Sequence, residues 1–140
     1  MNNYTLCLVC GEIYKTDLLP KYQTACPKYD CYGDNALIEL DEYMVYPIKI
    51  LNEKAWNTIY CCSGHIIDEF NHGYIAFYIE DNKDLFNIEP PKYWKWNENC
   101  LQATEDFTDN LSKNLTIIEN QIQSLLEWCK NLPCNPAFCD

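Results

Sequence analysis

The chain has 140 residues, 48% of them hydrophobic and 22% charged, which is enough for the core of one compact domain but not for two full-sized ones. Its 21 acidic residues outnumber its ten basic residues, all of which are lysine, and the formal net charge is −11. Nucleic-acid binding depends on a cationic surface and above all on arginine, so direct binding to nucleic acid is disfavoured.

The N-terminal sequence MNNYTLCLVC has no basic residue ahead of its apolar stretch, which argues against a secretory signal. No apolar run approaches the roughly 18 residues of a membrane-spanning helix. We therefore expect a cytoplasmic protein. Asparagine, lysine, isoleucine and tyrosine are abundant, a usage typical of A/T-rich coding sequences such as those of low-GC bacteria and their phages, and a phage protein would act in the host cytoplasm.

Two cysteine pairs near the N-terminus have the spacing of metal ligands. Cys7 and Cys10 belong to a C-x2-C-G turn, in which Gly11 tolerates the positive φ that such turns demand. Cys26 and Cys31 follow after 15 residues as a C-P-x3-C pair. The intervening stretch has the right length for a strand, a turn and a second strand. The spacing C-x2-C-x15-C-x4-C predicts a four-cysteine zinc ribbon with one structural zinc ion.

We assign residues 1–36 to this zinc ribbon and residues 37–140 to an α+β domain that packs with it as one compact unit. The second unit begins with a predicted strand, Ala36–Leu40, which is followed by a helix over residues 42–54. Pro47 fits only the first turn of that helix or a kink, because proline lacks a backbone donor.

Aromatic and β-branched residues are concentrated in Ala55–Cys62 and Tyr74–Glu80, which predicts two adjacent antiparallel strands around a loop. Lys92–Trp96 is a candidate for a further strand. From about Thr108 to Asn131 apolar residues recur at intervals of three and four, which predicts a long C-terminal helix. Its apolar stripe packs on the core or, alternatively, on a partner helix in a dimer. Together the elements predict an α+β fold with a zinc ribbon, a small antiparallel sheet and this helix.

The predicted loop opens with T-I-Y-C-C-S-G-H at residues 58–65. A helix, a strand ending in this motif and a tyrosine-led strand resemble small proteins of Gram-positive bacteria, phages and mobile elements in which the strand ends in S-C-S-G-H or S-C-E-G-H. The motif is also distantly similar to T-x-x-S-C-S-G-R of the wybutosine-synthesising tRNA methyltransferase family. Residues 58, 62, 63 and 64 match that pattern, whereas Cys61 replaces a serine and His65 an arginine. The likeness covers residues 42–80, and we carry no activity over from it.

The chemistry of this loop is open to several interpretations. Cys62 and His65 could form half of a metal site, which His72 and one of Cys100, Cys129, Cys134 or Cys139 would complete. Alternatively, Cys62 could be a nucleophile paired with one of the two histidines. The backbone N–H groups of Ser63 and Gly64 could line an anion pocket, or the loop could be a tight turn without a ligand. The candidate pocket residues are Thr58, Cys62, Ser63, Gly64, His65 and His72.

The remaining cysteines have no assigned role. Cys129, Cys134 and Cys139 repeat the x4 spacing of the second ribbon pair. With Cys100 they could hold a second zinc ion, they could form disulfides, or they could stay reduced. The roles of Cys61 and of any pairing among these residues are left open.

Residues 61–109 carry ten acidic residues and three lysines. This excess is either a solubilising surface or a face complementary to a basic partner. For the partner-binding face we select Asp68, Glu69, Asp81 and Asp84.

We expect a non-enzymatic, zinc-binding interaction protein encoded by a phage or mobile element. Its partner would be a host protein with a basic groove in a nucleic-acid-handling or defence complex, which it would inhibit in the manner of anti-CRISPR proteins. The alternative is a small-ligand-binding, nucleotide-binding or RNA-modification-related protein that uses the C-C-S-G-H loop.

Overall fold

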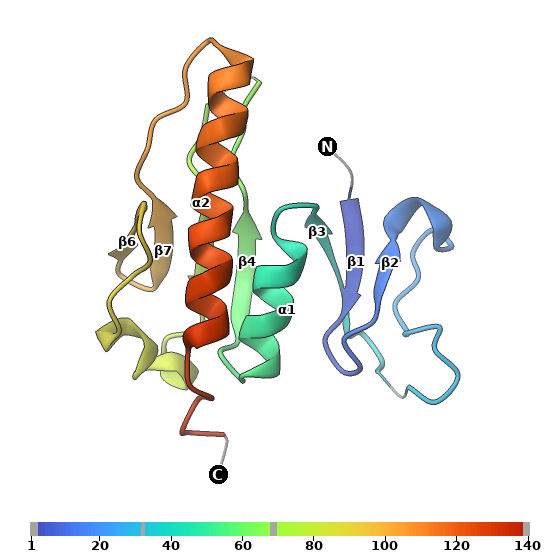
Figure 1. The fold of residues 1–140 in the computed structure, drawn as a ribbon. Helices are drawn as coiled ribbons and strands as arrows, with labels where there is room; N and C mark the ends of the chain where they lie inside the picture. Colours follow the sequence, from blue (N-terminus) through green and yellow to red (C-terminus); the bar gives the residue numbers. More distant parts are fainter. Residues whose placement is uncertain (1–2, 32, 68–69, 139–140) are drawn as a thin grey trace.

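The computed structural model describes residues 3–31, 33–67 and 70–138, and within them the chain forms an α+β fold, as predicted. Two antiparallel sheets are accompanied by two α-helices (Figure 1). The first sheet has the strand order β2-β1-β3 and the second has the order β4-β5-β7-β6. Neither helix in this described part of the chain combines the length and apolar character that a membrane span requires.

The first sheet consists of β1 (Asn3–Cys7), β2 (Ile13–Lys15) and β3 (Leu37–Asp41). Strand β1 is central, and its Leu6 is opposite Ile13 on one side and Ile38 on the other. These three apolar side chains share the face that packs against the core. The predicted strand Ala36–Leu40 is confirmed as β3, but it completes the first sheet, which therefore extends beyond the boundary placed after residue 36.

The segment between the two cysteine pairs holds one strand, not the two that were predicted. After β2 the chain forms a short 3-10 turn, Thr16–Leu18, and then continues without regular structure to Cys26. Pro20 cannot donate a hydrogen bond to a sheet, and Tyr22 has a φ of 66°, which lies outside the extended region. The third strand of this sheet is supplied by β3 instead.

Helix α1 (Val45–Glu53) follows a turn that is fixed by the carboxylate of Asp41. Oδ1 of Asp41 accepts hydrogen bonds from the N–H groups of Tyr43 at 3.0 Å and Met44 at 3.1 Å. Because of this turn, the helix begins at Val45 and not at residue 42 as predicted. Pro47 lies in the first turn, where a missing N–H group costs nothing.

The second sheet consists of β4 (Thr58–Cys62), β5 (Tyr74–Phe77), β6 (Trp94–Asn97) and β7 (Cys100–Ala103). The predicted antiparallel pair is confirmed by β4 and β5, in which Cys61 is opposite Ile75. Strand β6 matches the candidate strand Lys92–Trp96, displaced toward the C-terminus. Strand β7 was not predicted, because its sequence C-L-Q-A contains no β-branched or aromatic residue; its pairing with strands on both sides outweighs that low propensity.

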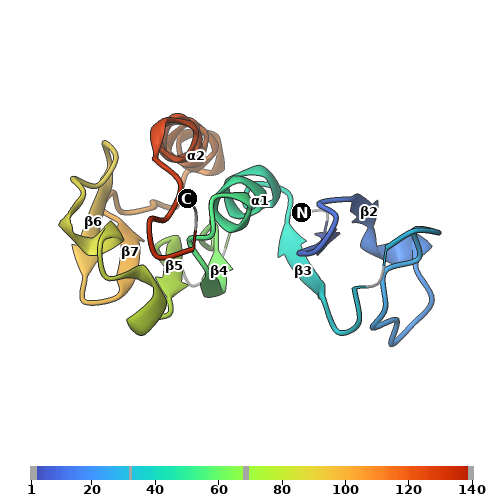
Figure 2. The same cartoon turned by 90° about the horizontal axis from the view of Figure 1, so that it is seen from below.

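The two faces of the second sheet have different surroundings. Ile75 and Phe77 of β5 are buried in one cluster with Leu51 of α1 and Leu125 of the C-terminal helix. Figure 2 shows both helices on this side of the sheet. Because side chains alternate along a strand, Tyr74 and Ala76 point to the other side, which neither helix covers. Tyr74 is half-buried there, and the small Ala76 is buried.

Helix α2 (Leu111–Asn131) is held at both ends by side-chain hydrogen bonds. At its start Asn110 accepts a hydrogen bond from the Lys113 N–H at 3.1 Å. At its end the Lys54 ammonium donates to the carbonyl oxygens of Cys129, Lys130 and Leu132 at 2.9, 2.7 and 2.6 Å. A cation at this end also interacts favourably with the helix dipole. The helix predicted from Thr108 thus begins slightly later and ends where it was expected.

Gln121 of α2 provides a test of the packing. Its side chain is almost fully buried, and neither the nitrogen nor the oxygen of its amide has a hydrogen-bond partner. An unpaired buried polar group costs about 1–3 kcal/mol. We therefore expect Gln121→Met, which removes the amide at similar volume, to raise the free energy of unfolding by about 1–2 kcal/mol.

Urea denaturation measures this change. Gln123→Met, at an exposed position of the same helix, is the matched control and should leave the stability within about 0.5 kcal/mol of wild type. A Gln121→Met protein no more stable than wild type would show that the amide is satisfied in solution.

Candidate metal centre

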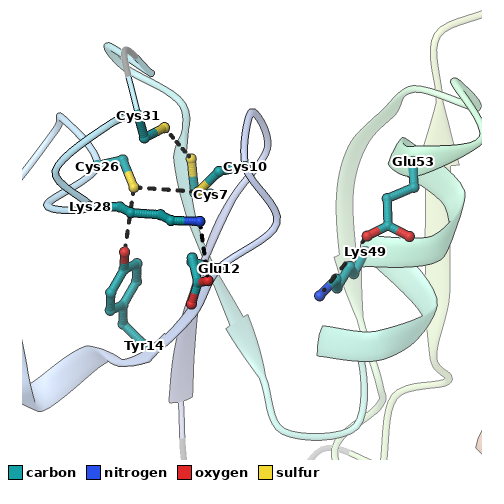
Figure 3. A network of polar contacts seen from close by, with 9 residues as sticks. All are labelled: Cys7, Cys10, Glu12, Tyr14, Cys26, Lys28, Cys31, Lys49 and Glu53. Atoms are coloured by element: carbon teal, nitrogen blue, oxygen red, sulfur yellow. Dashed lines mark hydrogen bonds and ion pairs between the residues drawn. The ribbon is translucent and has the colours of Figure 1, made fainter.

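Four cysteine thiols from two turns converge beside the first sheet. The sulfur atoms of Cys7, Cys10, Cys26 and Cys31 all lie within 4.8 Å of one another (Figure 3). Cys7 Sγ is 3.8 Å from Cys31 Sγ, and Cys10 Sγ is 3.6 Å from Cys26 Sγ. Four sulfurs at about 2.3 Å from one tetrahedral ion are separated by about 3.8 Å. The thiols singled out in the sequence could therefore hold a metal ion.

The backbone of the two turns explains why the thiols meet. The carbonyl of Cys7, at the end of β1, accepts a hydrogen bond from the Gly11 N–H at 2.9 Å. Gly11 has a φ of +80°, which glycine adopts without steric cost. In the second turn the Cys26 N–H donates to the Gly33 carbonyl at 3.0 Å, and the Gly33 N–H lies 3.4 Å from Cys31 Sγ. Each turn is thus closed by its own backbone.

Tyr14 of β2 adds a contact to the thiol cluster, since its hydroxyl lies 3.4 Å from Cys26 Sγ. Burial acts to raise the pKa of the Cys26 thiol, but this hydrogen bond and others from the backbone and neighbouring thiols outweigh burial and lower that pKa to about 7. Burial raises the pKa of the Cys10 thiol to about 12. Cys10 must therefore release a proton when a metal binds, so metal affinity rises with pH.

A set of four thiolates fills a tetrahedral coordination sphere. No position is left for a substrate or an activated water molecule, so a metal ion held here has a structural role. Beside the cluster, Lys28 and Glu12 form an exposed ion pair with a separation of 3.6 Å between Nζ and Oε1 (Figure 3). An exposed pair of this kind contributes little to stability. The connection between the two cysteine turns therefore depends on the thiols and not on this ion pair.

The sequence analysis did not identify Tyr14 as part of this site. The sequence did indicate which way Tyr14 points: side chains alternate along a strand, so if Ile13 faces the core, Tyr14 lies on the opposite face of the sheet. In the observed register Tyr14 is opposite Thr5. Since side chains alternate along β1, Thr5 and Cys7 share this face. Only the pairing of β1 with β2 shows that Tyr14 lies near the cysteines, and the sequence alone does not give that pairing.

Tyr14→Phe tests the hydrogen bond to the thiol cluster. We expect metal affinity to fall by about tenfold, because hydrogen-bond partners of metal ligands contribute on this scale, while the four thiols still bind. Titration with Co²⁺ against a competing chelator, followed by thiolate absorption, measures the affinity. Tyr29→Phe is the control, since Tyr29 is fully exposed. Equal affinities for both variants would show that the Tyr14 hydroxyl does not act on Cys26.

The candidate residues of β4 point in different directions. Thr58 accepts a hydrogen bond from the Asn52 side chain of α1 at 3.2 Å, on the helix side of the sheet. Cys62 is opposite Tyr74, whose side chain lies on the uncovered side. The strand therefore does not bring Thr58 and Cys62 together in one pocket.

Ser63 and Gly64 form the turn that ends β4. The Ser63 N–H donates to Oδ2 of Asp41 at 3.0 Å, and the Gly64 N–H lies 3.4 Å from Cys62 Sγ. Gly64 has a φ of +112°, and a Cβ atom there would lie 2.8 Å from the Phe107 ring. Both N–H groups have partners within the chain, and glycine is required by the close packing, so the geometry favours a structural turn over an anion pocket.

The two histidines are not joined to the Cys62 thiol by any of the described contacts. The His65 residue is exposed, and its backbone N–H donates to the backbone carbonyl of Asn71 at 3.0 Å. Nε2 of the half-buried His72 is 2.7 Å from Oδ1 of Asp106, which links this loop to the one after β7. The geometry therefore lends no support to a thiolate–imidazolium pair or to a metal site in this loop.

The other described cysteines do not form a second metal cluster. Cys61 and Cys129 pack in the core, and burial raises the pKa of each thiol to about 12. Cys100 is half-buried in β7. Cys134 is disulfide-bonded, and Cys139 lies outside the described residues.

The fold divides the acidic stretch between the two ends of the second sheet. The Phe77 N–H donates to the Asn99 carbonyl at 3.0 Å, so the segment after β5, with the half-buried Asp81 and the exposed Asp84, lies at one end. Asp106 lies beside His72 at the other end. A four-residue strand is about 13 Å long, which exceeds the Debye length of about 8 Å at physiological ionic strength. Two separate negative regions result; the candidates Asp68 and Glu69 lie outside the described residues.

Comparison of the chain with protein-family profiles, curated proteins and solved structures finds no match. The resemblance of the T-I-Y-C-C-S-G-H motif to other families therefore stays a prediction.

Proposed function

We propose that Cys7, Cys10, Cys26 and Cys31 hold one zinc ion and that the first sheet with its two turns is a zinc ribbon. Thiolates are soft ligands, and a closed set of four is typical of structural zinc sites. Burial supports this proposal, because Leu6 and two of the cysteines are the only buried apolar side chains described before Leu37. Such a small apolar core cannot stabilise this part of the chain, so metal binding contributes to its folding.

We expect about one zinc ion per chain in protein purified without chelator, and we expect Cys10→Ser to lose it and to unfold the residues up to 36 first. Elemental analysis gives the metal content, and amide hydrogen exchange identifies the segment that opens. Cys100→Ser is the control, because Cys100 is not part of the thiol cluster. The proposal fails if wild-type protein contains no zinc.

The face of the second sheet that neither helix covers, which we call the open sheet face, supports an interaction role. Its members are the outward positions of the four strands: Tyr60, Cys62, Tyr74, Ala76, Lys95, Asn97, Cys100 and Gln102. Tyr60, Lys95 and Asn97 are exposed, Ala76 is buried, and the other members are half-buried. Only Lys95 is charged among them, although the chain has a net charge of −11. The rings of Tyr60 and Tyr74 meet edge to face with centroids 5.8 Å apart, and Tyr60 is 60% exposed. Exposed tyrosine with little charge is typical of the centre of a protein interface.

Acidic residues stand at both ends of the open sheet face. Asp84 and Glu98 are exposed at one end, and Asp109 is exposed near the other. A complementary partner would therefore present basic groups on both sides of an uncharged centre. Surfaces that bind nucleic-acid phosphates are rich in such groups.

We therefore propose a non-enzymatic interaction protein, encoded by a phage or mobile element, that occupies the basic groove of a host nucleic-acid-handling or defence protein and inhibits it, as anti-CRISPR proteins do. Binding of a small ligand or nucleotide by the C-C-S-G-H loop is the alternative. It has less support, because the backbone N–H groups of Ser63 and Gly64 are already paired and no hydrogen bond among the described residues joins a histidine of the loop to Cys62.

Charge reversal tests the exposed acids at the two ends of the open sheet face, Asp84, Glu98 and Asp109, which we call the acidic flanks. Replacing Asp84, Glu98 and Asp109 by lysine should slow association with the partner by tenfold or more at low salt, because electrostatic steering raises association rates by about 10- to 1000-fold. The difference should shrink as salt is added, and the dissociation rate should change less. The partner is captured from extract of a low-GC Gram-positive host treated with nuclease, and association is measured against salt concentration.

The matched control replaces Asp17, Asp30 and Asp34 by lysine. These three residues are also exposed, and they lie in the N-terminal part of the chain. Both variants change the net charge by the same amount, so only the position of the charges differs. Equal association rates for the two variants would mean that the acidic flanks are a solubilising surface.

A further inference from the structure

A cavity of about 350 Å³ lies where the start of α1 faces the first sheet. Its walls are formed by residues of β1, β2, the turn before α1 and the first turn of α1, namely Tyr4, Ile13, Glu42, Tyr43, Val45 and Tyr46. Half of these side chains are tyrosine, and Glu42 is the one charged residue among them. The cavity belongs to neither the thiol cluster nor the open sheet face.

Local structure explains how tyrosines from separate segments reach this cavity. Tyr4 is opposite Leu40 in the first sheet and alternates with Thr5, so it shares the face of Leu6 that packs toward α1. The Asp41 turn sets the direction of Tyr43, which follows β3. Tyr46 lies in the first turn of α1 and is 60% exposed. One ring is therefore accessible, while Tyr4 and Tyr43 are half-buried.

The one charged group in the lining of the cavity is the carboxylate of Glu42. Burial and the nearby carboxylates of Glu42, Glu119 and Asp41 together raise the pKa of the Tyr43 hydroxyl. Lys15 is opposite Tyr4 in the sheet but is not among the lining residues. A cation entering this cavity would meet no lining ammonium group.

We propose that this cavity is an aromatic cage that binds an alkylated ammonium group. The faces of aromatic rings attract cations, and a weakly hydrated ammonium surrounded by methyl groups gains this attraction together with apolar contact. Ile13 and Val45 provide the apolar surface and Glu42 the opposite charge. An anion would find no positive group in the lining, and a divalent metal would find one carboxylate, so neither fits this set of residues. The group could belong to a free small molecule or to a methylated lysine side chain of a protein.

The test is a titration of the full-length protein, followed by NMR of the backbone amides and tyrosine rings. The probes are choline, N-acetyl-trimethyllysine amide and 3,3-dimethylbutanol, which is an uncharged compound of the same shape as choline. We expect the two ammonium compounds to shift the signals of Tyr4, Tyr43 and Tyr46, and we expect the alcohol to bind much more weakly. Tighter binding of choline would identify a free small molecule as the source, and tighter binding of the lysine derivative would identify a protein side chain.

Three variants make the result specific to the cage. Tyr46→Leu and Glu42→Gln should each weaken ammonium binding by roughly two- to fivefold, as expected for loss of one exposed cation–π or charge contact. Both positions are exposed, so the fold should persist. Tyr22→Leu, at an exposed tyrosine outside the cavity, should bind as wild type does.

Two results would overturn the proposal: equal affinity for choline and the uncharged alcohol, or no ammonium-dependent shift at these tyrosines. Neither result bears on the proposed function, because the charge-reversal test uses residues outside the cavity and does not depend on its occupancy.

Discussion

The arrangement of the two sheets depends on the carboxylate of Asp41. One of its oxygens accepts hydrogen bonds from the N–H groups of Tyr43 and Met44 before α1, and the other accepts one from the Ser63 N–H after β4. The two sheets share no strand ladder among the described residues. A single side chain therefore joins the end of the first sheet, the helix that follows it and the edge strand of the second sheet. Hydrogen bonds to a charged acceptor are roughly twice as strong as neutral ones, which suits this position.

Both proposed binding regions follow from that junction. The turn held by Asp41 directs Tyr43 toward the cavity, and the contact with Ser63 fixes the end of β4, whose Tyr60 and Cys62 face away from the helices. Helices α1 and α2 cover one face of the second sheet, which leaves the other free for a partner (Figure 2). The first sheet buries few apolar side chains, and Leu6 and Leu40 belong to the core that it shares with the helices and the second sheet. The thiol cluster at one end and this carboxylate at the other add contacts that the core does not supply.

The sequence was most informative where a pattern is local. Cysteine spacing identified all four members of the thiol cluster, because each of its two pairs is a local motif, although the contacts between the pairs span 16 and 24 residues. Apolar periodicity located α2, because a helix is formed by contacts over a few residues. Strand β7 and the contribution of Tyr14 were missed because each depends on pairing with a distant strand. The acidic residues of positions 61–109 were close in sequence, yet antiparallel strands carry them to opposite ends of a sheet. The tyrosine cavity was also invisible, since it joins β1 and β2 to the segment entering α1, and only the tertiary fold brings these together.

The charged residues and the tyrosines act on different properties of a complex: the charges set the association rate, and the tyrosines set the lifetime of the complex. Long-range attraction depends on net charge, and the excess of acidic residues acts in this way on any cationic surface. Exposed acids are screened by salt, however, so they contribute mainly to the association rate. The lifetime of a complex depends on desolvated contacts at its centre, for which tyrosine is well suited because it buries a large area with little loss of side-chain freedom. The open sheet face supplies such contacts where Lys95 is the one charged side chain, and the tyrosine cavity supplies them beside the carboxylate of Glu42. At the open sheet face the acids lie at the ends and not within it, which avoids the cost of desolvating a carboxylate on binding, whereas in the cavity Glu42 directly opposes the charge of a cation. Both arrangements are expected of a protein that recognises cationic partners.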